Sequence, residues 1–146
     1  MIQNITKDSM TLAIIIRTQY RKDGIEFFTP DDFSQQLAYM KRPTGYVIQP
    51  HVHNPVKREV QFTKEVLFIK SGKVRVDFYS EAQEYLESTE LNAGDVILLA
   101  YGGHGFYVVE EAEIIEVKQG PYAGERDKTR FGPIEHNQVK LIEDKQ

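Results

Sequence analysis

The sequence predicts an all-β protein, and its pattern of strands and turns carries that prediction. Short runs rich in β-branched and aromatic residues follow one another closely, and clusters of turn-forming residues separate them. Close spacing of this kind is typical of a β-barrel or a β-sandwich. From residue 45 onward we expect strands at 45–53, 65–70, 73–79, 84–91, 95–101, 104–109 and 113–118.

One domain is expected, because the 146 residues contain no internal repeat, low-complexity tract or linker. Residues 1–44 would supply strands and a short helix that pack on a barrel formed by residues 45–120. Residues 121–146 form a tail of mixed charge, with Val139 to Ile142 as a candidate edge strand.

The single helix is expected to begin at Thr29. This residue is a suitable N-cap, Pro30 follows in the first turn, and Asp32 lies three residues after the cap. The helix would run to about Lys41 and end before Pro43.

Two strand-like runs, 11–18 and 25–29, precede this helix. Lys22-Asp23-Gly24 between them is a turn signal, so the two runs are expected to form a hairpin. The run from Thr11 to Thr18 is apolar enough that a free edge there would promote aggregation. Covering it against a second copy predicts a homodimer.

Composition excludes several classes of function. The formal net charge of −4 and the pI near 5.6 leave no general basic surface for nucleic acid or for an anionic membrane. The chain has no Cys, which removes disulfide scaffolds, thiol nucleophiles and iron–sulfur clusters, so any metal must be held by His and carboxylate. The apolar stretch Leu12 to Ile16 is too short for a signal peptide or a membrane span, and we expect a cytoplasmic location.

Two of the four histidines, His51 and His53, form an H-x-H pair. Side chains alternate along a strand, so both imidazoles would project from the same face at a spacing suited to chelation. Two hydrogen-bonded or solvated histidines on a strand would give the same pattern.

Together with residues that follow it, this pair forms two motifs that resemble those of the cupin superfamily. The first cupin motif, G-x5-H-x-H-x3–4-E-x6-G, is similar to Gly45-x5-His51-x-His53 together with Glu65-x6-Gly72. The second motif, G-x5-P-x-G-x2-H-x3-N, is matched loosely by Gly94-Asp95, Gly102 and His104, with Ala100 and Val108 in place of its Pro and Asn.

The resemblance implies a cupin-type β-barrel (jelly roll) that holds one divalent transition metal. Imidazole and carboxylate ligands suit iron, manganese, nickel, copper or zinc. The implied ligands are His51, His53, Glu65 and His104.

Residues 54–64 make the first motif longer than the family's. If the insertion is a longer loop, Glu65 faces the barrel interior together with Leu67 and Ile69. If the strand register differs, Glu59 or Gln61 is the nearer oxygen ligand, and Glu65 contacts the ligands and not the metal. We prefer Glu65, because the spacing that follows it keeps the family's pattern.

The insertion carries Lys57, Arg58 and Lys64 against Glu59. Basic side chains at the mouth of a metal cavity would attract an anionic small molecule. Solvated charges on a surface loop would give the same sequence pattern. The expected substrate-binding residues are Gln49, Lys57, Arg58 and Tyr101.

These observations predict a metal-binding cupin that binds or acts on a small polar, anionic molecule such as a sugar or keto acid derivative. An enzyme, either a metal-dependent oxygenase or an isomerase, is favoured over the alternatives. Those are a non-catalytic ligand-binding module with a structural metal, and a metal-free sugar epimerase that uses His and Tyr.

Overall fold

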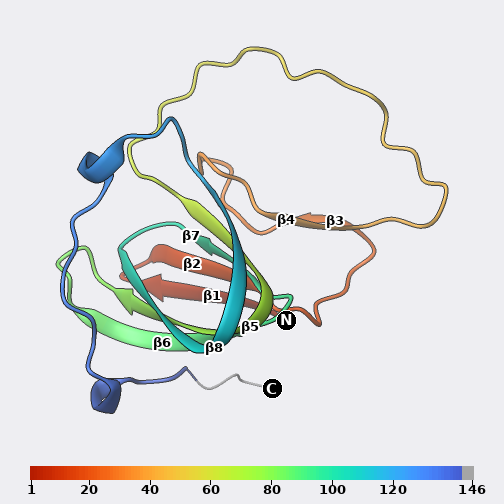
Figure 1. Ribbon diagram of the computed structural model, residues 1–146. Coiled ribbons are helices and arrows are strands. Elements are labelled where there is room, and N and C mark those ends of the chain that lie inside the picture. The colour runs from red at the N-terminus through yellow and green to blue at the C-terminus, as the bar shows by residue number, and fades with distance from the viewer. Residues whose placement is uncertain (143–146) are drawn as a thin grey trace.

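The computed structural model describes residues 1–142 and confirms the all-β prediction for them. The strands are β1 (Ile2–Lys7), β2 (Met10–Ile16), β3 (Gly24–Phe27), β4 (Ala38–Lys41), β5 (Glu65–Tyr79), β6 (Tyr85–Asn92), β7 (Val96–Leu99) and β8 (Gly103–Lys118). Six of them form one antiparallel sheet in the order β1-β2-β7-β5-β6, with β8 paired to β5. The sheet curls into a half-barrel, and the β3–β4 hairpin forms a second, two-stranded sheet (Figure 1).

The helix expected from Thr29 to Lys41 is wrong, because this segment closes the β3–β4 hairpin instead. The Thr29 hydroxyl accepts a hydrogen bond from the Leu37 amide (3.2 Å), so it bridges the hairpin and caps no helix. The hairpin buries Leu37 against Ile14 and Leu98. Tertiary burial of this kind outweighs a weak local helix signal.

The hairpin expected from runs 11–18 and 25–29 is also wrong. β2 lies between β1 and β7, while β3 pairs with β4. Both edges of β2 are therefore paired within the described sheet, and Leu12 to Ile16 is buried. The argument for a homodimer through this strand fails, and the dimer itself stays a prediction.

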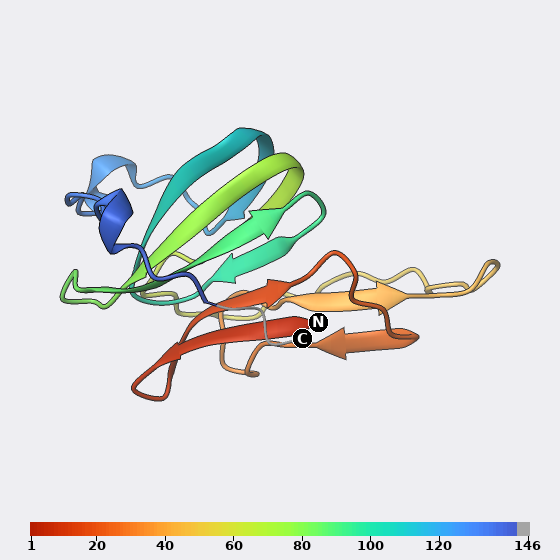
Figure 2. The ribbon, with the colours of Figure 1, turned by 90° about the horizontal axis from the view of Figure 1, so that it is seen from below.

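β5 and β8 are long strands where shorter ones were expected on either side of Gly72 and Ala112. Figure 2 shows the two strands curving together over the rest of the sheet. The curve is centred where their register shifts, between Ile69 and Val74. Gly72 adopts a φ of 78° there, and its backbone lies against that of Glu111. A β-bulge at a glycine bends a strand pair in this way.

The main core cluster joins strands from both halves of the curled sheet. Leu67 and Ile69 on β5 are buried in it, as the alternation from Glu65 predicted. Val74, Val76 and Phe78 on β5 continue the cluster beside β6. The curled sheet thus fixes the start of β5, where Glu65 lies.

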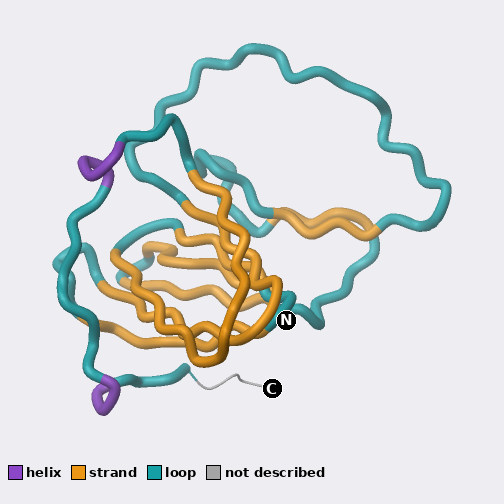
Figure 3. Tube along the Cα trace, viewed as in Figure 1, coloured by secondary structure: helices purple, strands orange, loops and turns teal. Residues whose placement is uncertain are grey.

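Residues 42–64, which we call the arm, connect β4 to β5 without regular secondary structure (Figure 3). The strand expected at 45–53 is therefore wrong in this structure. Every residue from 42 to 62 is exposed. In Figure 1 the arm arches away from the sheet before it returns to β5.

The tail contains two 3-10 turns, η1 (Gly124–Asp127) and η2 (His136–Gln138). The edge strand expected from Val139 to Ile142 is reduced to one parallel bridge between Leu141 and Ser88. The last part of the predicted tail, residues 143–146, lies outside the described residues. Across residues 1–142, neither helical turn has the length or the apolar character needed to cross a bilayer.

Candidate functional site

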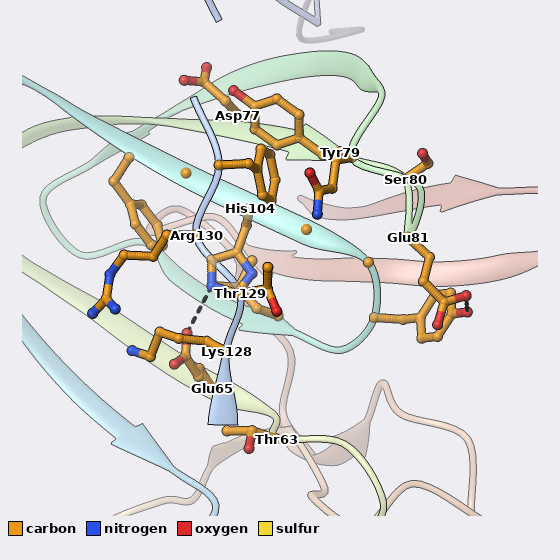
Figure 4. Close-up of a pocket in the computed structure, with 18 of the residues that line it drawn as sticks. Thr63, Glu65, Asp77, Tyr79, Ser80, Glu81, His104, Lys128, Thr129 and Arg130 are labelled. Carbon is orange, nitrogen blue, oxygen red and sulfur yellow. Dashed lines mark hydrogen bonds and ion pairs between the residues drawn. The ribbon is translucent and has the colours of Figure 1, made fainter. Parts of the chain in front are cut away.

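Glu65 and His104, two of the predicted metal ligands, are in direct contact. Glu65 begins β5 and His104 lies near the start of β8, and His104 Nε2 is 3.0 Å from Glu65 Oε2 (Figure 4). The Glu65 backbone is held by Leu99 on β7 and by Lys118 on β8. The side chains of Glu65 and His104 are 14% and 30% exposed. The sheet therefore presents a half-buried carboxylate–imidazole pair.

The protonation state of this pair follows from its surroundings. The hydrogen bond from His104 holds the pKa of Glu65 below its ordinary value, and the positive charges of Lys118 and Lys128 act in the same direction against the effect of burial. Glu65 is therefore a carboxylate at neutral pH and can only accept. His104 must donate from Nε2, which leaves Nδ1 as the ring nitrogen that can bond a ligand.

The lowered pKa of Glu65 predicts a pH-dependent contribution to stability. Because ionisation is easier in the folded chain, the contribution is complete above about pH 4.5, the ordinary pKa, and is lost as pH falls through the lower folded value. Glu65→Gln is expected to cost about 1 kcal/mol at pH 7 and nothing at strongly acid pH. Urea unfolding of both proteins across pH measures this. Glu59→Gln, on the exposed arm, is the control, and an equal pH dependence in that variant would contradict the assignment.

The pair lies in a pocket of about 620 Å³ that is lined by the first residues of β8 and by segments on either side of them. One wall comes from the end of β5 and the turn after it, with Tyr79 and Glu81, and another from the segment between β7 and β8. The third wall comes from residues 127–133 of the tail, as Figure 4 shows for Lys128, Thr129 and Arg130. The pocket is therefore built from parts of the chain that are distant in sequence.

Tyr101, a predicted substrate-binding residue, lines this pocket. Its hydroxyl donates to Glu81, and this hydrogen bond raises the pKa of the Tyr101 phenol. Its ring packs edge-to-face on Phe62 at the end of the arm, with centroids 5.7 Å apart. The Tyr101 phenol is therefore protonated at neutral pH, and its hydroxyl points toward Glu81.

The sequence analysis missed the wall from residues 127–133. Phe131 holds this segment in place by packing edge-to-face on Tyr79, with centroids 5.0 Å apart. The segment approaches β8 at Gly103, where a side chain would meet the Phe131 ring. The only signal was the basic pair Lys128 and Arg130 beside an aromatic residue, in a tail of otherwise mixed charge.

The other predicted site residues lie on the arm. His51 and His53 neighbour each other, with ring centroids 5.3 Å apart, and His51 Nδ1 is 2.9 Å from the carbonyl oxygen of Gln49. All three are exposed, as is Lys57. Within the described chain they do not join Glu65 and His104.

Arg58 and Glu59 line a second pocket, of about 680 Å³. Its opposite side comes from the β3–β4 loop, including Asp31 and Asp32. Glu59 therefore faces this second pocket, and Glu65 is the acid beside His104.

The donor set for a metal is incomplete in the described chain. Glu65 and His104 supply one carboxylate and one imidazole, and across residues 1–142 no three His, Asp or Glu side chains are grouped closely enough to hold an ion. A site for iron, manganese, nickel, copper or zinc needs more protein ligands than this pair. The residues as arranged do not fit the implied metal, and no chemical step is derived through one.

The half-barrel is compatible with the jelly roll that the cupin resemblance implies. The motif residues Glu65, Gly72 and His104 lie on its two longest strands. Membership of the cupin superfamily is a prediction from these motifs, since no protein-family model, curated protein or solved structure compared with the chain matches it.

Proposed function

We propose that this protein binds a small polar, anionic organic molecule in the pocket beside Glu65 and His104 and moves a proton on it. The observation that carries the proposal is the hydrogen bond between the ionised Glu65 and the His104 imidazole at the pocket wall. A carboxylate that fixes an imidazole is a common arrangement for general-base catalysis. Keto sugars and keto acids are suitable substrates, because the hydrogen on the carbon next to a carbonyl is acidic.

His104 is the base in this proposal. Its Nδ1 takes the proton from the carbon, and Glu65 stabilises the imidazolium that forms at Nε2. The electron pair moves to the carbonyl oxygen, which the protonated Tyr101 hydroxyl can meet if it leaves Glu81. Return of a proton to the opposite face of the same carbon gives epimerisation. Return of the proton to the former carbonyl carbon gives isomerisation, if the hydroxyl proton of the first carbon moves to the former carbonyl oxygen.

Basic side chains on one side of the pair could bind an anionic group, although the pocket lining also contains the acids Glu65, Asp77, Glu81 and Asp127. Lys118 and Lys128 lie close enough to Glu65 to lower its pKa, and Arg130 lines the same pocket. Arg130 pairs with Glu125, whose side chain is exposed. A carboxylate or phosphate group would bind on this side, with the carbonyl directed to His104.

The proposal predicts that His104→Ala removes proton transfer while leaving binding in place. The assay incubates the protein in D₂O with dihydroxyacetone phosphate, pyruvate and ribulose 5-phosphate, and follows deuterium uptake next to the carbonyl by NMR. Loss of a positioned general base should slow exchange by about 100-fold or more. His136→Ala is the matched control, because His136 packs edge-to-face on Tyr107 and does not line the pocket.

Two results would contradict the proposal. One is exchange that is equally fast in the His104→Ala and His136→Ala proteins. The other is binding of dihydroxyacetone as tight as that of its phosphate, since an anion site should favour the phosphate by about tenfold, or 1.4 kcal/mol.

A transition-metal centre is the second candidate function. It is favoured by the position of Glu65 and His104, half of the four-ligand set, on facing strands of one pocket. It requires His51 and His53 to approach this pair, and the metal content of the same His104→Ala and His136→Ala proteins tests it. Near-stoichiometric metal in the control and a large loss in His104→Ala would support a metal-binding protein.

A further inference from the structure

The outer edge of β8 has no partner strand in the part of the chain that the structure describes. β8 pairs with β5 alone, along its whole length. Its apolar side chains remain exposed on both faces of the strand: Phe106, Tyr107, Val108, Val109, Ile114, Ile115 and Val117. A long, exposed, apolar edge strand is a template for pairing with another segment.

The arm has the properties of the missing strand. Its segment 46–53 has no regular secondary structure and carries exposed apolar residues, among them Tyr46, Val47, Ile48 and Val52. Pro50 lies in the middle of this segment and cannot donate a backbone hydrogen bond. If residues 49, 51 and 53 bond β8, Pro50 points its nitrogen outward, which is the position that proline tolerates in an edge strand.

The two segments also carry opposite charges. The arm has four basic side chains, Arg42, Lys57, Arg58 and Lys64, against the single acid Glu59. β8 has four acids, Glu110, Glu111, Glu113 and Glu116, against the single base Lys118. Complementary charge steers two surfaces together and fixes their relative position.

We propose that the arm of one copy pairs with the outer edge of β8 in a second copy, and that the exchange is reciprocal. In this structure the arm leaves its own body at β4 and arches away from its own β8, so it is presented outward (Figures 1 and 2). Reciprocal exchange about a two-fold axis covers both exposed edges at once and closes the assembly.

This exchange would bring residues of the second copy into contact with the pocket. Phe62 and Thr63, at the end of the arm, line it, and Phe62 packs on Tyr101. The first half of β8 carries His104 and Phe106 into the same pocket. A strand laid along that part of β8 would form a further wall of the pocket, made by the second copy. The inference goes beyond the proposed proton transfer and does not depend on it.

The absence of native Cys allows a direct test by single-cysteine cross-linking. Val52→Cys places a thiol on the arm and Val108→Cys places one on β8, at side chains 85% and 53% exposed, so neither change should disturb folding. The two variants are mixed, unfolded, refolded together and treated with a short bismaleimide. We expect a covalent dimer in the mixture at several times the yield found with either variant alone.

Met10→Cys, in the exposed turn at the start of β2, replaces Val108→Cys in the control mixture and should give no excess dimer. Sedimentation of the unmodified protein should show a dimer. Lys57→Glu combined with Arg58→Glu should raise its dissociation constant by about tenfold, whereas Lys7→Glu with Arg21→Glu should not.

Three results would overturn the exchange. The first is a monomer at every concentration in sedimentation. The second is a dimer whose mixed variants do not cross-link above the control. The third is efficient cross-linking within one chain of the Val52→Cys/Val108→Cys double variant, which would show that the arm folds back on its own β8. Each of these leaves the test of His104 in proton transfer unaffected.

Discussion

Replacing Asp95 with alanine is expected to lower the free energy of unfolding by about 3–5 kcal/mol. Asp95 is 1% exposed and accepts hydrogen bonds from Arg17 Nη1 (3.0 Å), the Thr18 amide (2.8 Å) and the Asn92 amide (2.9 Å). The variant would remove a buried carboxylate partner of the Arg17 guanidinium and the acceptor of two backbone amides.

Urea unfolding followed by circular dichroism measures this loss. Asp23→Ala is the matched control, because Asp23 also pairs with a base, Lys41, at 2.7 Å, but its side chain is 88% exposed. An exposed pair contributes only about 0–1 kcal/mol. If the two variants lose similar stability, the buried ion pair is not the anchor that its contacts indicate.

Gly72→Ala is expected to destabilise the protein by about 2–4 kcal/mol. The φ of 78° is unfavourable for any side chain, and a Cβ at this position would lie 2.0 Å from the Glu111 carbonyl oxygen. Both strands of the β5–β8 pair would have to move apart at the bend. The expected result is a lower urea midpoint and a weaker pairing of the two strands at this point.

Gly132→Ala is the control for this change, since a Cβ at Gly132 would meet no other atom within 4 Å. Thermal and urea unfolding of the two variants give the comparison. A Gly72→Ala protein as stable as Gly132→Ala would mean that the bend adapts to a side chain, and the backbone contact with Glu111 would then have no energetic role.

The predictions that held depend on short-range patterns. The alternation of Glu65, Leu67 and Ile69 was sufficient to place two buried side chains and one pocket carboxylate on one face of β5. The strand expected at 84–91 appears as β6, one residue later at each end. Period-two patterning within a paired strand is a local property, which a single sequence displays directly.

The predictions that failed depend on partners distant in sequence. Thr29 and Pro30 give the same signal at a helix N-terminus as in a hairpin loop, and the burial of Leu37 against Ile14 decides between them. The segment 45–53 has strand-like residues, but a strand also needs a neighbour, and in this structure the segment pairs with no strand of the described sheet.

The candidate site was predicted in part for the same reason. Glu65 and His104 were identified from a motif and are in contact, whereas His51 and His53 from the same motif are on the exposed arm. The wall from residues 127–133 has no motif and became visible only through its packing on Tyr79. When a site is assembled from the ends of several strands, no single segment of the sequence carries a pattern that identifies it.

The separation in sequence of the paired strands also affects when the site can form during synthesis. Arg17 and Asp95 are 78 residues apart in sequence. One edge of β5 can pair only after β8 has been synthesised. Topologies dominated by such distant contacts fold slowly, on a scale of about milliseconds to seconds. On the ribosome, Glu65 emerges well before His104 and before the tail segment that closes the pocket. The nascent chain can pair β5 with β6 and β7, but it holds the edge of β5 that β8 occupies unpaired until β8 has emerged, which is the interval in which a chaperone would protect it.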